Sequence, residues 1–567
     1  MTASAGARWI AGSLLAALIL FVFLPTLGQG WAPIDDELNF VDNPDYRGFS
    51  IAHLRWIWTT RLAGHYIPLS WMTLAADFAW SGMDPWGYHL TNVVLHLANG
   101  LLLFALAGRL FEPASEKGSS ILGAFACAAF FALHPLRVES VAWITERRDV
   151  LCGFFSLLAV LAYCRAARDT GTRRPLVRLL ALVAFAAALL SKGIAIMLPV
   201  ALLALDVRPL RRLNDDPRRW LDREARPVLL EKLPYLVLAA VVAGVTLWAA
   251  APVRHQAQTG LEHRLLSAGF GLSFYLDKTL LPLAIPFQMP VTHLLSLSRD
   301  GLVALRGVLF LVLCAATLGL WRRTPALALA LAVFAAFVLP VSGLFQAGPQ
   351  LAAHRYTYLA TMPLALLLGA AIEVFARRTP SRRWVAAAAV GVTTLGLAVA
   401  TRAQVGLWQD PVTFMRAAVR AAPDDWASVS GLARVHLERG EAGEALAVVR
   451  AGRERSPDAL MLIYLEAMVL ATSSDDGLRD GRQAVALASR AARLTGLRDP
   501  AALLALAAAR AELGETAEAR RILVTAEGLA KAGRKPAFLP LLQKATRQIE
   551  ASGNVRFDAG DWRGSAL

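Results

Sequence analysis

Residues 9–40 read WIAGSLLAALILFVFLPTLGQGWAPIDDELNF, an apolar run followed a few residues later by an acidic pair. The run from Trp9 to Leu27 has about the 20 apolar residues that an α-helix needs to cross a bilayer. A cleaved signal peptide begins in a similar way, but the Ala-x-Ala pattern is missing and many further apolar runs follow. The segment therefore predicts an uncleaved first span whose N-terminus lies in the cytoplasm.

The rest of the chain divides into two regions of different composition. Hydrophobic residues make up 56% of the 567 residues, which is too many for an ordinary soluble enzyme. Apolar runs recur up to about Arg402, after which the chain becomes charged, alanine-rich and helix-periodic. We therefore expect a polytopic membrane domain over residues 1–402 and a soluble helical domain over residues 403–567.

The first region predicts about eleven transmembrane helices. Their approximate ranges are 9–27, 88–111, 119–133, 149–164, 176–191, 192–206, 233–251, 302–321, 325–343, 357–376 and 384–401. The arginine-rich loops 165–175, 207–232, 322–323 and 377–383 then all fall on the cytoplasmic side, as loop charges usually do. This clustering in short loops explains the net charge of +15 without nucleic acid as a partner.

The apolar segment 265–285 is left out of this count. It carries Asp277 and Lys278 in its middle and prolines near its end, so we expect a re-entrant or interfacial hairpin on the outer side. An odd number of spans places segment 28–87, loop 134–148 and the C-terminal domain on the outer side as well. In a Gram-negative bacterium this arrangement means an inner-membrane protein with a periplasmic tail.

The C-terminal region has the period of a tetratricopeptide repeat (TPR). Pro423 and Pro457 lie 34 residues apart, and small or apolar residues occupy the expected packing positions between them. The pattern returns from Pro500, after an insertion around SSDDGLRDG. We expect a short TPR α-solenoid that binds a peptide or partner protein, or alternatively a stabilising cap without a ligand. The last stretch, from about Ser552, is expected to be poorly ordered.

The acidic pair Asp35-Asp36 is the first candidate for chemistry. Two carboxylates beside the membrane can supply a general base for a hydroxyl acceptor, or they can coordinate a divalent cation. Acidic pairs are also common in solvated loops, which is the alternative interpretation. No other cofactor is indicated, and the four cysteines occur singly, without a disulfide or zinc pattern.

The predicted outer loop FALHPLRVESVAWITERRDVL concentrates charges at membrane depth, where they are costly unless paired or functional. Its candidate site residues are His134, Glu139, Arg147 and Asp149. The alternative is a helix end held by local salt bridges, Glu139 with Arg137 and Asp149 with Arg147.

Isolated cations mark two further positions. Lys192 lies between two apolar runs, and Arg355 with Tyr356 opens another. Cations of this kind would neutralise a departing lipid phosphate. Lys192 can also simply extend to the interface, and Arg355 can simply position a helix start.

One apolar span carries a polar stripe. His89, Asn92, His96 and Asn99 share one helix face, so they must face protein or a cavity. His89 and His96 are too far apart to hold one zinc ion unaided, and we expect interhelical hydrogen bonds instead. The chain carries no nucleotide-binding or hydrolase motif, so a transferase would take its donor from the bilayer.

Several motifs, in order, resemble one family. DDELNFVDNP, HYIPLSWMTLAADFAWSGMDPWGYHLTNVVLHLANGLLLF, ALHPLRVESVAWITERRDVL and HRYTYLATMP are similar to the transmembrane and tetratricopeptide-repeat O-mannosyltransferase-like proteins, which have the GT-C fold. The resemblance implies an inverting glycosyltransferase that moves a sugar, mannose in the family, from a polyprenyl-phosphate donor to a hydroxyl, such as that of a protein Ser or Thr.

The resemblance also implies roles for matching residues. Asp35, with Asp36 as alternate or helper, would accept the proton of the attacking hydroxyl. Lys192, Arg147, Arg355 and Tyr356 would bind the donor phosphate. Residues that would support the sugar or acceptor, or support the site structurally, are His65, His89, Asn92, His134, Glu139 and Asp149. Two competing functions are a non-enzymatic scaffold for envelope assembly and a transporter of lipid-linked glycans.

Overall fold

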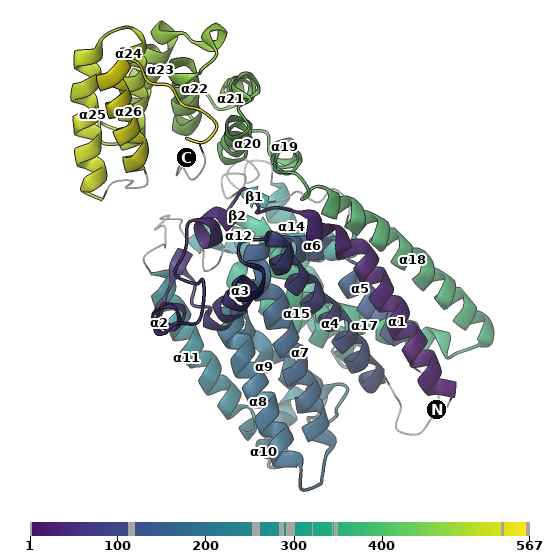
Figure 1. The fold of residues 1–567 in the computed structure, drawn as a ribbon. Coiled ribbons are helices and arrows are strands. Elements are labelled where there is room, and N and C mark those ends of the chain that lie inside the picture. The colour runs from purple at the N-terminus through teal and green to yellow at the C-terminus, as the bar shows by residue number, and fades with distance from the viewer. Residues whose placement is uncertain are drawn as a thin grey trace. The chain divides into compact units, whose positions relative to one another are not determined.

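The computed structural model describes residues 3–111, 120–251, 261–282, 288–290, 301–319, 321–342, 344, 350–533 and 538–562. The chain forms two compact units, Met1–Gln409 and Asp410–Leu567. Both are built from helices (Figure 1). Apart from helices, the described residues contain one short antiparallel pair, β1 (Gln288–Pro290) with β2 (Gln350–Ala353). The protein is therefore an all-α polytopic membrane protein, as predicted.

The helices of the first unit follow one another closely along the chain. They are α1 (Ala3–Phe23), α2 (Ile51–Thr59), α3 (Pro68–Ser81), α4 (Pro85–Phe111), α5 (Ile121–Ala132), α6 (Val138–Ala142), α7 (Arg147–Arg168), α8 (Arg174–Ser191), α9 (Leu198–Val207), α10 (Arg226–Leu230), α11 (Leu233–Ala250), α12 (Leu261–Leu280), α14 (Leu302–Gly319), α15 (Pro325–Val338), α16 (Thr357–Ala360), α17 (Met362–Ala376) and α18 (Pro380–Gly406).

Each predicted span coincides with a helix. Among the described residues, six helical stretches are long and apolar enough to cross a membrane, and up to eight if the two bent pairs around α5–α6 and α16–α17 each count as one span. The other predicted spans correspond to shorter apolar helices, Gly193–Val207, Leu305–Gly319 and Pro325–Val341. A further short apolar helix, α22 (Leu460–Thr472), lies in the core of the second unit instead.

The basic loops meet at one end of the first unit. Arg168 donates to the carbonyl of Arg109, and Arg377 donates to that of Phe111. Arg178 pairs with Glu231, while Trp321 donates to the carbonyl of Asp215. These contacts join the ends of different helices, so the four loops share one end of the helical unit.

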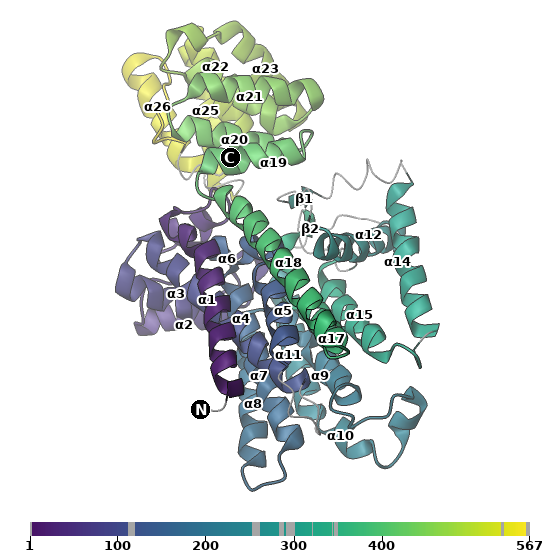
Figure 2. The ribbon, with the colours of Figure 1, turned by 90° about the vertical axis from the view of Figure 1, so that its right-hand side faces the viewer.

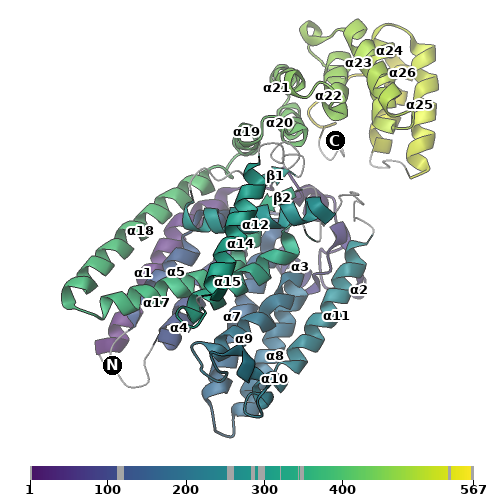
Figure 3. The ribbon, with the colours of Figure 1, turned by 180° about the vertical axis from the view of Figure 1, so that it is seen from behind.

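The predicted hairpin in segment 265–285 is wrong over its described part. Residues 261–280 form one uninterrupted helix, α12, because Pro282 follows the helix rather than interrupting it. Residues 283–287 lie outside the described part of the chain. The helix α12 packs on α14 and lies at the same end as β1 and β2 (Figures 2 and 3).

The polar stripe on α4 makes the predicted interhelical hydrogen bonds. Asn99 donates to Tyr358 Oη (2.8 Å) and to the carbonyl of Val150 (2.8 Å). His96 bonds the same tyrosine through Nδ1 (2.8 Å) and the carbonyl of Ala132 through Nε2 (3.0 Å). Three segments distant in sequence are thereby fixed to α4.

Small residues allow α5 and α17 to approach closely. A Cβ atom at Gly123 would lie 2.5 Å from the carbonyl oxygen of Gly369 and 2.7 Å from Glu373 Cβ. Such small-residue crossings let membrane helices pack backbone against backbone. Glu373 completes the contact by accepting the Gly123 N–H at 2.9 Å.

Replacing Gly123 by alanine is therefore expected to destabilise the protein by about 1–3 kcal/mol, the usual cost of overpacking. The backbone carbonyl of Gly369 cannot rotate out of the way. Thermal unfolding of the purified protein in detergent measures the effect. Gly108→Ala on α4 is the matched control, because a Cβ atom there meets nothing within 4 Å. Equal melting temperatures for the two variants would contradict this packing.

The second unit consists of antiparallel helix pairs. Its helices are α19 (Pro411–Ala421), α20 (Trp426–Glu438), α21 (Ala442–Arg455), α22 (Leu460–Thr472), α23 (Gly481–Leu494), α24 (Pro500–Glu512), α25 (Thr516–Lys531) and α26 (Leu539–Ser552). The pairs α20–α21, α22–α23 and α24–α25 correspond to the three predicted repeats, and the predicted insertion is the short helix Asp476–Leu478. Their classification as tetratricopeptide repeats stays a prediction.

The end of the second unit is ordered as far as Trp562, so the prediction of a poorly ordered stretch from Ser552 is wrong there. Val555, Phe557 and Trp562 are buried in the core of the unit. The Phe557 N–H also donates to the carbonyl of Thr472 at 3.1 Å. Val555 and Phe557 alternate with charged residues, but the apolar side chains in this stretch are few and glycines surround them, so the sequence does not predict a packed element.

Candidate active site

The two adjacent carboxylates of the acidic pair have different surroundings. Asp36 is fully buried, and its Oδ1 accepts the N–H (3.2 Å) and the hydroxyl (2.7 Å) of Thr145. Its Oδ2 accepts the N–H of Ala32 at 2.9 Å. Burial raises the pKa of Asp36 to about 7, against the effect of these hydrogen bonds. Asp36 thus joins the segment after α1 to the loop before α7.

Asp35 is accessible to solvent, and its carboxylate makes no hydrogen bond to any residue that the structure describes. Most of its surroundings are nevertheless protein, and this desolvation raises the pKa of Asp35, whereas Arg148 and Arg355 lower it. Asp35 is therefore an uncommitted carboxylate beside two arginines.

These arginines belong to an ion network centred on Glu146, whose side chain is fully buried. One carboxylate binds three cations: Arg148 at 2.5 Å, Lys192 at 2.9 Å and Arg355 at 3.2 Å. The cations come from the start of α7, the turn after α8 and the segment before α16. Buried charges persist only when paired in this way.

Two further acids complete the network. Asp149 Oδ1 binds Lys192 at 2.7 Å, and its Oδ2 accepts the hydroxyl of Ser140 at 3.0 Å. Glu139 pairs with the guanidinium of Arg355 and accepts the Arg355 N–H at 2.9 Å. The alternative of local salt bridges, Glu139 with Arg137 and Asp149 with Arg147, is therefore wrong. Both acids instead bind cations from distant segments. Lys192 likewise does not simply extend to the interface.

Aromatic rings line the same cations. Arg355 lies over the rings of Tyr356, at 5.0 Å, and Trp143, at 5.3 Å. The ammonium of Lys192 lies 6.0 Å from the centre of the Tyr356 ring. The cations are thus held in place by acids and rings, while Lys192 keeps 15% of its side chain exposed.

His65 lies close enough to this network for its charges to act on the imidazole. Its pKa is lowered to about 3 by desolvation, with Arg148, Lys192 and Arg355 adding to the effect. The imidazole is therefore neutral at physiological pH. Asp35 and His65, from two different parts of the segment between α1 and α4, are thus both influenced by the charges of Arg148 and Arg355.

Other candidate residues lie deeper in the unit. Arg147 is fully buried and bonds Asp77 (2.6 Å), the carbonyl of Tyr88 (2.7 Å) and Asn92. Its guanidinium therefore connects α3, α4 and α7, apart from the network around Glu146.

The predicted histidines also bond the backbone. His89 Nε2 lies 3.4 Å from the carbonyl of Gly30, and His134 Nε2 lies 3.1 Å from that of Thr279. Asn92 donates to the carbonyl of Val141 at 3.2 Å. The structure thus brings together Asp35, His65, Glu139, Asp149, Lys192, Arg355 and Tyr356, and places Arg147, His89, Asn92 and His134 among supporting contacts.

The acidic pair does not fit a divalent metal. Both oxygens of Asp36 already accept hydrogen bonds, and Asp35 faces arginines. Among the described residues no group of three or more His, Cys, Asp or Glu side chains could hold a metal ion.

Comparison with known proteins supports the resemblance seen in the motifs. Protein O-mannosyl-transferase TMTC4 of Mus musculus is 29% identical over 154 residues, which cover 24% of this chain and 21% of the mouse protein. Protein O-mannosyl-transferase Tmtc1 of Drosophila melanogaster is 34% identical over 158 residues, 26% of this chain and 18% of the fly protein. This chain is a relative of the TMTC O-mannosyl-transferases.

The matched stretch spans about a fifth of the length of these TMTC relatives, 21% in the mouse protein. Protein O-mannosyl-transferase tmtc2 of Xenopus laevis, at 33% identity over 174 residues, is covered to 19%. No protein-family model matches the chain, and no solved structure matches it.

Two charged residues of the site were missed as candidates in the sequence. Arg148 and Glu146 stand in the motif ALHPLRVESVAWITERRDVL that resembles the TMTC family, next to the chosen Arg147. The helical phase at the start of α7 separates them, because Arg147 points toward α3 and α4 whereas Arg148 points toward Glu146. Helix α7 begins at Arg147, so consecutive residues there point in different directions. Knowing this boundary would have distinguished the two arginines.

Proposed function

We propose that this protein is a membrane glycosyltransferase that moves a sugar, mannose by analogy with its relatives, from a polyprenyl-phosphate donor to a protein hydroxyl. The observation that carries the proposal is the uncommitted carboxylate of Asp35 beside Arg148 and Arg355, which share the carboxylate of Glu146 with Lys192. A base and a set of cations at one place are what such a transfer requires. The choice of mannose as the sugar and of a protein as the acceptor follows the relatives, which are protein O-mannosyl-transferases.

The reaction is a direct displacement. The acceptor oxygen attacks the anomeric carbon, its proton passes to Asp35, and the bond between that carbon and the phosphate oxygen breaks. Attack from the face opposite the leaving group inverts the anomeric configuration. Lys192, Arg148 and Arg355 stabilise the charge on the departing phosphate, which is the usual role of fixed cations in phosphate-releasing reactions.

The acids of the network act as positioning residues. Glu146, Glu139 and Asp149 hold the cations in fixed places before the donor binds. Such preorganisation avoids the cost of moving charges during the reaction. Asp36 has a similar role in the proposal, since its hydrogen bonds to Thr145 fix the segment that carries Asp35.

An apolar cavity of about 390 Å³ offers a place for the lipid tail of the donor. It is lined by residues of α4, α7, α9, α15 and α17. Its lining includes Ser156 and Leu359, on the helices that begin beside the ion network, and ends at Arg208 and Arg377. An isoprenoid chain matches this almost wholly apolar wall.

The proposal places the site and the repeat unit on the outer face of a bacterial inner membrane, with the basic loops in the cytoplasm. Within the first unit, the end of α18 lies near the acidic segment, since Gln29 donates to the carbonyl of Val405 at 3.3 Å. The ring of Trp408 lies 6.3 Å from that of Trp143. The last helix of the first unit therefore ends beside the segment that carries Asp35. In this proposal the role of the repeat unit is to bind the acceptor polypeptide.

Reconstitution tests this function. The purified protein in liposomes is supplied with polyprenyl-phosphate mannose and a peptide containing Ser and Thr, and mass spectrometry follows the peptide. The expected result is a mass increase of one hexose on a hydroxyl residue. Glycan and glycoprotein profiles that are the same in wild-type and Asp35→Asn cells with normal expression would instead favour the scaffold.

The pH dependence of transfer follows from Asp35. A base must be deprotonated, and the pKa of Asp35 is raised above its ordinary value of 3.8 by desolvation. We expect kcat/KM to fall as the pH decreases through this raised pKa, so the acidic limb lies above pH 3.8. A pH–rate profile with saturating donor measures it. A rate that stays constant down to pH 3.8 would argue against Asp35 as the base.

A further inference from the structure

The second unit contains a cavity of about 390 Å³ that the transfer reaction does not use. It lies where the first helices of the three pairs, α20, α22 and α24, begin. Its main lining residues are Trp426, Asp458, Met461, Tyr464, Asp499 and Ala502. The cavity is therefore shared by three successive helix pairs and lies wholly within this unit.

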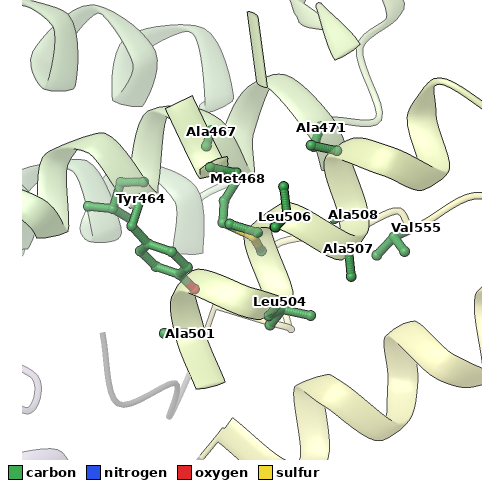
Figure 4. Packing of buried hydrophobic residues seen from close by; sticks show 14 of the residues in the cluster. Tyr464, Ala467, Met468, Ala471, Ala501, Leu504, Leu506, Ala507, Ala508 and Val555 are labelled. Atoms are coloured by element: carbon green, nitrogen blue, oxygen red, sulfur yellow. The ribbon is translucent and has the colours of Figure 1, made fainter. Parts of the chain in front are cut away.

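Tyr464 gives the cavity a buried polar group. The residue is only 2% exposed, and its hydroxyl has no hydrogen-bond partner among the residues that the structure describes. Figure 4 shows the ring of Tyr464 with its hydroxyl oxygen directed toward the part of α24 that carries Ala501, another lining residue. A buried hydroxyl without a partner is costly, and a ligand in the cavity would supply the missing bond.

Two carboxylates also belong to the cavity wall, those of Asp458 and Asp499. Asp499 caps α24 by accepting the Ala501 N–H at 2.9 Å. Burial is the main cause that raises the pKa of Tyr464, and the nearby carboxylate of Asp499 raises it further. Asp458 is exposed at the rim, where Arg490 of this unit already pairs with it. The wall thus presents oxygen atoms that accept hydrogen bonds.

Trp426 adds an aromatic face at the rim and is 44% exposed. Cations bind the face of tryptophan better than that of any other side chain. Met461 and Ala502 add apolar side chains to the cavity wall. Carboxylates, an aromatic face and an apolar wall together match a cation on a flexible aliphatic stem.

We propose that this cavity binds a lysine or arginine side chain of a polypeptide segment. The cationic head would donate to Asp499 and to the hydroxyl of Tyr464, and the aliphatic stem would pack against Met461. Concave faces of stacked helix pairs commonly bind extended peptides, which bring such side chains to them. The proposal concerns binding, and it does not require that sugar transfer occurs.

The test uses the full-length protein in detergent, without donor. Fluorescence anisotropy follows two labelled peptides, Gly-Ser-Gly-Lys-Gly-Ser-Gly and the same peptide with norleucine in place of lysine. The lysine peptide is expected to bind at least about tenfold more tightly, because norleucine keeps the stem but lacks the charge. Asp499→Asn is expected to lower its affinity about tenfold while still capping α24.

Asp480→Asn is the matched control, since Asp480 caps α23 in the same way but does not line the cavity. This variant should bind the lysine peptide like the wild type. Equal affinity for the two peptides, no binding of either, or binding unchanged in both Asp499→Asn and Tyr464→Phe would overturn the proposal. Sugar transfer is measured separately on a peptide without lysine or arginine, so a failure of one proposal is distinguishable from a failure of the other.

Discussion

Asp35→Asn is expected to lower the rate of sugar transfer by about 10²–10⁴-fold, the contribution of a general base. Asparagine preserves the shape of the side chain but cannot accept the proton of the attacking hydroxyl. Because the Asp35 carboxylate makes no hydrogen bond to the described residues, the variant should fold and bind donor like the wild type. Single-turnover transfer of a labelled sugar to peptide measures the change.

Two neighbouring variants make this result specific. Asp45→Asn changes an exposed acid of the same segment and should transfer at the wild-type rate. Asp36→Asn should lower the melting temperature as well as the rate, because Asp36 holds Thr145 and Ala32. A wild-type rate in Asp35→Asn would show that another group takes the proton.

Glu146→Ala is expected to destabilise the protein by about 3–5 kcal/mol, as removal of one partner from a buried ion pair usually does. The change leaves Arg148, Lys192 and Arg355 without the carboxylate that joins them. Thermal unfolding and the yield of monodisperse protein in detergent both report the loss.

Asp222→Ala is the matched control for this variant. Asp222 forms a long ion pair with Arg219, at 4.0 Å, in which both side chains are more than half exposed. Pairs of this kind contribute about 0–1 kcal/mol. Similar melting temperatures for Glu146→Ala and Asp222→Ala would mean that the network around Glu146 does not stabilise the fold.

The helices were predictable because their signal is local. The composition of a run such as Trp9–Leu27 is enough to predict a membrane span. The spacing of the polar residues from His89 to Asn99 is enough to predict a helix face that contacts protein. Helix boundaries were harder, and the continuous helix α12 shows that two adjacent charges do not interrupt a helix whose prolines come after it.

The partners of the charged residues were not predictable in the same way. Glu139 pairs with Arg355, and Glu146 with Lys192, across long stretches of chain. The sequence offers each acid a nearer cation, and only the packing of α7, α8 and α16 decides which one it meets. The motifs therefore identified the region of the site, whereas the fold decides which of its residues face one another.

The bond between Asp36 and Thr145 has a consequence for how such a site can diversify. Asp35 lies on one segment and the cations follow on another, and the hydroxyl of Thr145 connects the two through both Asp36 and Asn39. Thr145 therefore helps to fix the distance between the proposed proton acceptor and the cations, although the proposal gives Thr145 no part in proton transfer or phosphate binding. Replacing Thr145 by a shorter or longer residue is expected to change the width of the space that the acceptor enters in the proposed reaction. The preferred acceptor would then change, while the base and the cations stay the same.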